Sequence, residues 1–120
     1  MAEQVIIMPV VALRGLTILP GMVLHFDVNR PKSVAAVEKA MVGDQRLFLV
    51  AQRHPEIVDP ELGELFQVGT VAVVKQLVKL PGKVVRGLVE GLERGELLCL
   101  DSEEPALIGE IGSIEMDGEE

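Results

Sequence analysis

The chain has almost no aromatic side chains, since tryptophan and tyrosine are absent and the three phenylalanines are Phe26, Phe48 and Phe66. Proteins that hold exposed bases stack them on aromatic rings, and we expect these phenylalanines to be core residues instead. Cysteine is equally scarce. The single Cys99 excludes an intramolecular disulfide and fits a reducing compartment. Because Cys99 lies among leucines, we expect it to be a buried apolar thiol and not a nucleophile.

The motifs of several common enzyme classes are also missing. None of Ser33, Ser102 and Ser113 lies in a Gly-x-Ser-x-Gly elbow, and no Gly-x-x-x-x-Gly-Lys-Ser/Thr segment is present to cradle phosphates. His25 and His54 have no second His or Cys at a spacing that suits zinc. We therefore expect no catalytic residue, no metal and no cofactor in this chain.

Charge and hydropathy predict a cytoplasmic protein. The N-terminal apolar run has no basic cluster before it and is interrupted by Pro9 and Arg14, so neither a signal peptide nor a membrane span is predicted. All 11 basic residues precede residue 101, and the net charge of −8 therefore comes from the acidic end of the chain. We interpret that end as a solvated edge strand running into a linker, with an acidic docking tail as the alternative.

Alternation and apolar runs predict a mainly β protein with one helix. Residues 5–13 indicate a buried strand in which Pro9 marks an edge or a break. Apolar and polar side chains alternate over residues 22–28, as in a half-buried strand. Pro31 suits the first turn of a helix that Gly43 ends. Other strands are predicted within 46–52, 68–94, 96–100 and 106–114, and a surface loop over 53–64.

The longest predicted element is a hairpin over residues 68–94, with a Leu-Pro-Gly-Lys turn at 80–83. Proline fixes φ at the second turn position, and glycine accepts a positive φ at the third. A straight arm of a dozen residues would reach about 40 Å, so we expect the arms to curl. Gly87 and Gly91 are the predicted sites of a bend or bulge, and Gly95 is predicted to turn the chain. The six or seven strands predict a small barrel or a strongly twisted sheet.

Two groups of side chains are candidate binding residues. The first consists of apolar residues at turns or bends, where they cannot all be buried and where methionine adapts to varied partners; they are Pro20, Met22, Leu80, Pro81 and Leu88. The second is a basic cluster around the hairpin turn that could contact phosphates; it consists of Lys75, Lys79, Lys83 and Arg86. Local packing of the apolar residues and solvation of the basic ones are the alternatives.

Seven short segments stand out along the chain. They begin with Leu-Arg-Gly and Leu-Pro-Gly-Met and end with Val-Glu-Gly-Leu-Glu-Arg, and they occupy residues 13–15, 19–22, 27–33, 48–53, 68–72, 80–82 and 89–94. In order and spacing they resemble the N-terminal domain of bacterial Lon protease. No single segment is decisive, but together they are highly specific, and the resemblance extends over residues 5–115.

The resemblance implies a PUA-like small curled β-barrel, of Lon N-terminal type, over residues 1–116. Residues 117–120 would begin an acidic linker to helical and ATPase modules further along, which would hold ATP, magnesium and the serine protease site. The implied function of this chain is non-catalytic recognition of unfolded or damaged proteins, with support for assembly of a cytoplasmic hexamer. The alternatives are a PUA-like nucleic-acid-binding module, a standalone Lon-like adaptor and a structural module between subunits; no membrane partner is expected.

Overall fold

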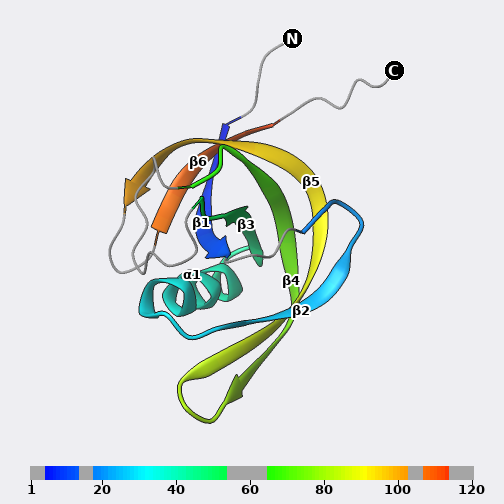
Figure 1. The fold of residues 1–120 in the computed structure, drawn as a ribbon, viewed down its shortest axis with the longest axis vertical. Helices are drawn as coiled ribbons and strands as arrows, with labels where there is room; N and C mark the ends of the chain where they lie inside the picture. Colours follow the sequence, from blue (N-terminus) through cyan, green and yellow to red (C-terminus); the bar gives the residue numbers. More distant parts are fainter. Residues whose placement is uncertain (1–4, 14–17, 54–64, 103–106, 114–120) are drawn as a thin grey trace.

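The computed structural model describes residues 5–13, 18–53, 65–102 and 107–113. These residues form six strands and one helix (Figure 1), which confirms the predicted fold class. The helix is α1 (Pro31–Val42), and the strands are β1 (Val5–Leu13), β2 (Val23–Val28), β3 (Arg46–Ala51), β4 (Val68–Leu80), β5 (Val84–Ser102) and β6 (Leu107–Ser113). Within the described ranges, no helix is long and apolar enough to cross a membrane.

The strands form one sheet that closes on itself. Their order is β2-β5-β4-β3-β1-β6, and β5 pairs with β6 as well, so the five strands other than β2 make a closed barrel. The β1–β3 pair is parallel and the other pairs are antiparallel. In Figure 1, β5 arches over the barrel, and the β4–β5 hairpin continues past it with β2 alongside. β2 is therefore an edge strand outside the closed ring.

β1 shows why a proline is accepted inside a barrel. Pro9 is buried and lies opposite Ile108 of β6. Pairing with β3 begins only at Val10, so at Pro9 the strand has one described neighbour. Because proline cannot donate a backbone hydrogen bond, it is tolerated where one side of a strand is unpaired. The predicted strand and its local edge are both confirmed.

The curl of the long hairpin comes from two shifts in register. One lies between Val71 and Ala72, where β5 has an additional residue next to Gly91, and the other lies between Val74 and Gln76 of β4. Extra residues of this kind bend a strand and increase its twist. The predicted irregularity at Gly91 is confirmed.

Gly87 and Gly95 have roles other than the predicted ones. Gly87 pairs regularly with Leu77, and a Cβ there would lie 3.2 Å from the ring of Phe26. Gly95 does not turn the chain, because β5 runs through it to Ser102; a Cβ at this position would lie 2.7 Å from the Ile111 side chain. Both glycines provide room for a neighbouring side chain, so the predictions of a bend at Gly87 and a turn at Gly95 were wrong.

The helix has the predicted limits. Pro31 occupies its first turn, and the N–H of Gly43 caps its end by donating to the carbonyls of Ala40 and Lys39 at 3.1 and 3.2 Å. Gly43 has a φ of −92°, whereas Gln45 carries the positive φ of 67° that leads into β3. The buried face of α1 packs mainly on β1.

Two hydrophobic clusters lie on opposite faces of the β1–β3 pair. Val11 and Leu13 belong to the first cluster, which also contains residues of α1, β2, β4 and β5. Val10 and Ala12 belong to the second, which contains residues of β4, β5 and β6. Burial of each large apolar side chain contributes about 1.5–3 kcal/mol. The alternation along β1 thus anchors the helix on one face and closes the barrel on the other.

Candidate functional site

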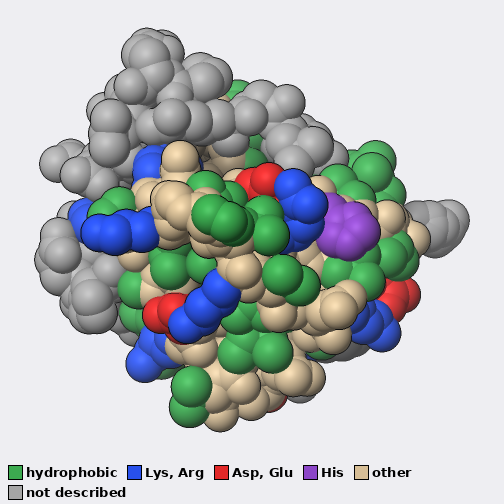
Figure 2. Space-filling view, turned by 90° about the horizontal axis from the view of Figure 1, so that it is seen from below, with side chains coloured by type: hydrophobic (Ala, Val, Ile, Leu, Met, Phe, Trp, Pro, Cys, Tyr) green, Lys and Arg blue, Asp and Glu red, His purple; other side chains and the backbone are tan. Residues whose placement is uncertain are grey.

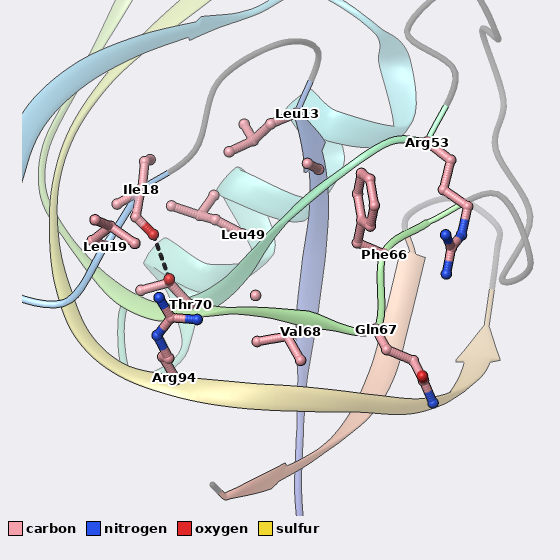
Figure 3. A pocket seen from close by; sticks show the side chains of 12 residues that line it. Leu13, Ile18, Leu19, Leu49, Arg53, Phe66, Gln67, Val68, Thr70 and Arg94 are labelled. Carbon is pink, nitrogen blue, oxygen red and sulfur yellow. Dashed lines mark hydrogen bonds between the residues drawn. The ribbon is translucent and has the colours of Figure 1, made fainter. Parts of the chain in front are cut away.

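An open apolar pocket of about 470 Å³ lies between the segment before β2 and the segment that leads into β4 (Figure 3). Its floor belongs to the first hydrophobic cluster and is made of Leu13, Ile18 and Leu49. Its rim is exposed and apolar, with 43% exposure of Leu19 and 44% of both Phe66 and Val68. The pocket therefore opens the core to solvent, and ligand pockets are commonly concave and apolar in this way.

One wall of the pocket is the turn formed by residues 19–22. Pro20 and Gly21 occupy its central positions, and Gly21 has the positive φ of 88° that a type II turn requires. The N–H of Met22 donates to the Leu19 carbonyl at 3.1 Å, which closes the turn. Two further hydrogen bonds, both of 2.9 Å, join the turn to Gly91 of β5. The Gly21 N–H donates to the Gly91 carbonyl, and the Gly91 N–H donates to the Met22 carbonyl. Leu19 is thereby fixed at the rim.

Gly91 lets this wall lie directly on the barrel. A Cβ at Gly91 would lie 2.5 Å from the Leu19 carbonyl oxygen and 3.2 Å from the Thr70 methyl group. Behind the turn, the buried Thr70 hydroxyl donates a hydrogen bond to the Ile18 carbonyl (Figure 3). The position of Leu19 thus depends on close backbone packing, because a side chain at Gly91 would occupy the same space.

The opposite wall is the segment of Phe66 and Gln67. The Phe66 N–H donates to the Ala51 carbonyl at 3.0 Å, and the Gln67 carbonyl accepts from Leu97 at 2.7 Å. This backbone pairing leaves the Phe66 ring at the rim. The prediction that all three phenylalanines are core residues is therefore wrong for Phe66, whereas Phe26 and Phe48 are buried.

Two arginines complete the lining and lie at opposite ends of the pocket (Figure 3). Arg94 of β5 lies beside Thr70, its cross-strand neighbour. The guanidinium carbon of Arg53 is 4.9 Å from the centre of the Phe66 ring, a cation–π contact. Within the described residues, neither arginine has a carboxylate at ion-pair distance. The pocket thus combines apolar walls with two cations that could meet an anionic group.

The five predicted binding residues fall in different places. Pro20 and Met22 lie in the turn that carries Leu19, next to the pocket. Leu80 and Pro81 lie at the far end of the β4–β5 hairpin, and Leu88 lies between, opposite His25 of β2. Seven residues of β5 separate the level of Met22 from that of Leu80, or about 23 Å. The five therefore do not form one compact patch, and their role in binding stays a prediction.

The basic cluster of the hairpin is largely paired with acids. Lys75 lies 3.0 Å from Glu90, Lys79 lies 3.5 Å from Glu38 of α1, and Arg86 lies 2.8 Å from Asp27 of β2. Across this end of the molecule, hydrophobic side chains alternate with Lys, Arg, Asp and Glu (Figure 2). Three of the four cations are already neutralised locally, which weakens the nucleic-acid interpretation because that binding depends on free cations.

The remaining candidates show no assembled chemistry. His25 is exposed, as predicted, while Cys99 is only partly buried, so its predicted full burial is wrong. Among the residues that the structure describes, no group of three or more His, Cys, Asp or Glu side chains could hold a metal ion. His54, most of the loop predicted at 53–64 and the linker predicted at 117–120 lie outside the described residues.

A closed barrel with an apolar pocket at its rim has the architecture of a small binding domain. A sequence profile of the ATP-dependent protease La (LON) substrate-binding domain matches residues 7–120. The chain belongs to this family of Lon substrate-binding domains. The match covers the barrel, the helix and both walls of the pocket.

Individual relatives and solved structures agree. The Lon protease of Lachnoclostridium phytofermentans is 47% identical over 117 residues, which are 98% of this chain and 14% of that protein. The Lon protease of Clostridium acetobutylicum is 45% identical over 105 residues, or 88% of this chain and 14% of its own length. The chain thus spans about one seventh of these relatives. The solved N-terminal domain of Mycobacterium avium complex Lon protease shows the same fold, with a TM-score of 0.72 and 21% identity. The match covers 91% of this chain and 55% of that chain.

Proposed function

We propose that this domain binds apolar segments of unfolded or damaged proteins and presents them to an ATP-dependent Lon-type serine protease. An unfolded chain differs from a folded one chiefly in its exposed apolar side chains. The observation that carries the proposal is the pocket, in which Leu19, Phe66 and Val68 expose apolar surface at the edge of the core. We further propose that the domain supports assembly of a cytoplasmic hexameric parent enzyme.

The adjoining turn supports a binding role for two of the predicted residues. The Met22 sulfur atom accepts a 3.3 Å contact from the backbone N–H of Leu19, so the Met22 side chain lies against the backbone that carries Leu19. Methionine is flexible and polarizable, which suits contacts with varied sequences. Pro20 is exposed beside them. We therefore include Pro20 and Met22 in the proposed binding surface, and treat Leu80, Pro81 and Leu88 as a separate candidate surface.

The test is the affinity of this chain for fluorescently labelled casein, a largely unfolded protein, measured by anisotropy. Phe66→Ser and Leu19→Ser should each weaken binding about tenfold, because each removes a large apolar contact worth about 1–3 kcal/mol. Val42→Ser is the matched control, because Val42 is 90% exposed at the end of α1 and does not line this pocket. Equal affinities for all four proteins, or no binding by the unmodified chain, would contradict the proposal.

A further inference from the structure

Building on the proposed function, we propose that the pocket selects extended polypeptide segments in which two acidic residues flank an apolar one. The proposal comes from the arrangement of charge around the apolar walls. Arg94 lies at the end near Ile18 and Leu19, and Arg53 lies at the end near Phe66 (Figure 3). The apolar lining between them would hold a side chain, and each guanidinium would meet a carboxylate.

The two arginines differ from Arg46 and Arg86 in their pairing. Arg46 contacts Asp44 at 3.0 Å, and Arg86 contacts Asp27 at 2.8 Å. Within the described ranges, no such carboxylate accompanies Arg53 or Arg94. Guanidinium groups form strong, directional hydrogen bonds with carboxylates. No described carboxylate therefore competes with an acidic ligand for the two cations of the pocket, whereas Arg46 and Arg86 are already neutralised.

The Arg53 guanidinium is held in place by the pocket, and Arg94 is partly buried at the other end. Arg53 lies over the Phe66 ring, and its Nε donates to the Leu65 carbonyl at 3.2 Å. Arg94 is partly buried beside Thr70, whose hydroxyl is engaged by the Ile18 carbonyl. A side chain that is already ordered loses less conformational entropy when a ligand arrives. Arg53 is exposed, whereas the partial burial of Arg94 strengthens an ion pair there relative to one in bulk water.

The backbone limits the distance between the two positions beside which the charges lie. Arg94 is paired with Thr70, and Arg53 lies over Phe66, which is four residues before Thr70. Four extended residues span about 13 Å at most, and the chain bends at Gln67. A bound strand repeats its side-chain direction at every second residue. The matching ligand therefore has acidic residues at most about four positions apart, with an apolar residue between them on the same face.

The volume of the pocket agrees with an extended peptide as the ligand. The pocket of about 470 Å³ is larger than one apolar side chain requires, and it leaves space for the peptide backbone across the rim. An extended segment suits an unfolded substrate, because no prior structure has to be broken. Charge selection would also limit the binding of purely apolar segments, since those leave the partly buried Arg94 without an acidic partner in the ligand.

The test compares three labelled peptides of equal length by fluorescence anisotropy with this chain. In the first, two glutamates flank a leucine at the spacing above; in the second, both are glutamine; in the third, the two glutamates are adjacent at one end. The first should bind about tenfold more tightly than the others, since one charge-assisted hydrogen bond is worth that factor. Arg94→Gln should remove most of this preference.

The control variant is Arg86→Gln, which removes the same charge on the hairpin and should leave the preference intact. Equal binding of the first and second peptides, or equal losses in Arg94→Gln and Arg86→Gln, would overturn the charge selection. Equal binding of the first and third would overturn the paired arrangement. Failure of the proposed function gives a different result. In that case a Phe66 variant and the unmodified chain would bind casein and all three peptides equally. The unfolding midpoint of each variant in urea confirms that it is folded.

Discussion

The pocket and the hairpin extension, by which we mean β2 with residues 75–88, both combine apolar and cationic side chains, yet they differ in how the cations are satisfied. In the hairpin extension, Lys75, Lys79 and Arg86 each contact an acid. In the pocket, no described carboxylate accompanies Arg53 or Arg94. Composition alone therefore does not distinguish a binding surface from a solvated one. The pairing of charges does, because an already paired cation has less to gain from a ligand.

The largest expected contrast is between two phenylalanines. Phe48→Ala should lower the free energy of unfolding by about 3–5 kcal/mol, because its fully buried ring belongs to the second cluster. Phe66→Ala should cost less than about 1.5 kcal/mol, because nearly half of its ring is exposed, but it should weaken casein binding. Urea unfolding followed by circular dichroism measures both. Equal losses of stability would mean that Phe66 is a core residue after all.

A second contrast uses two glycines, one in each region. Gly91→Ala should cost about 1–3 kcal/mol by overpacking and weaken casein binding, because the new methyl group meets the Leu19 carbonyl. Gly82→Ala has open space around it but a positive φ of 81°, and should cost about 1–2 kcal/mol. It should leave binding unchanged. Unfolding and anisotropy would be measured on the same preparations, and a binding defect in Gly82→Ala would assign the site to the hairpin extension.

The smallest expected effect concerns the exposed pair of Asp27 and Arg86. Hydrogen bonds from the Arg86 guanidinium at 2.8 and 3.1 Å lower the pKa of Asp27 below its usual value of 3.8. Stability from this pair is therefore fully present above that usual value and is lost as the pH falls through the lower pKa of the folded state. Because both groups are exposed, the gain is small.

The NMR titration of the Asp27 carboxyl carbon measures this shift directly. In Arg86→Gln, the midpoint should rise toward the usual value of 3.8. Casein binding near neutral pH should be the same as for the unmodified chain. A midpoint that does not move would mean that the pair of Asp27 and Arg86 does not persist in solution. Arg86 would then no longer count among the paired cations.

Local signals explain which parts of the fold could be predicted from the sequence. Pro31 and Gly43 mark the helix, and the Pro-Gly pairs mark two turns in which Gly21 and Gly82 have positive φ. The turn predicted at Gly95 was wrong because the sequence does not distinguish a glycine at a turn from a glycine that makes room for a neighbouring side chain. The Ile111 side chain comes close to Gly95 only when β5 pairs with β6.

The pocket could be predicted only in part. Pro20 and Met22 adjoin it because turn residues are recognisable locally. Phe66 and Arg94 were not predicted to line a site, since their positions follow from the pairing of β4 with β5 and from backbone bonds between distant segments. Period-two alternation predicts which side a residue faces, but not whether another segment covers that side. The two walls of this pocket are such segments, residues 19–22 and residues 66–67.

The most direct test of the pocket as the binding surface is the map of amide shift changes when unlabelled casein is added to the ¹⁵N-labelled chain. The account predicts the largest changes at Leu19, Met22, Phe66, Val68 and Arg94, with residues 80–83 unaffected. Changes confined to residues 80–83 and the neighbouring lysines, with none around the pocket, would contradict it.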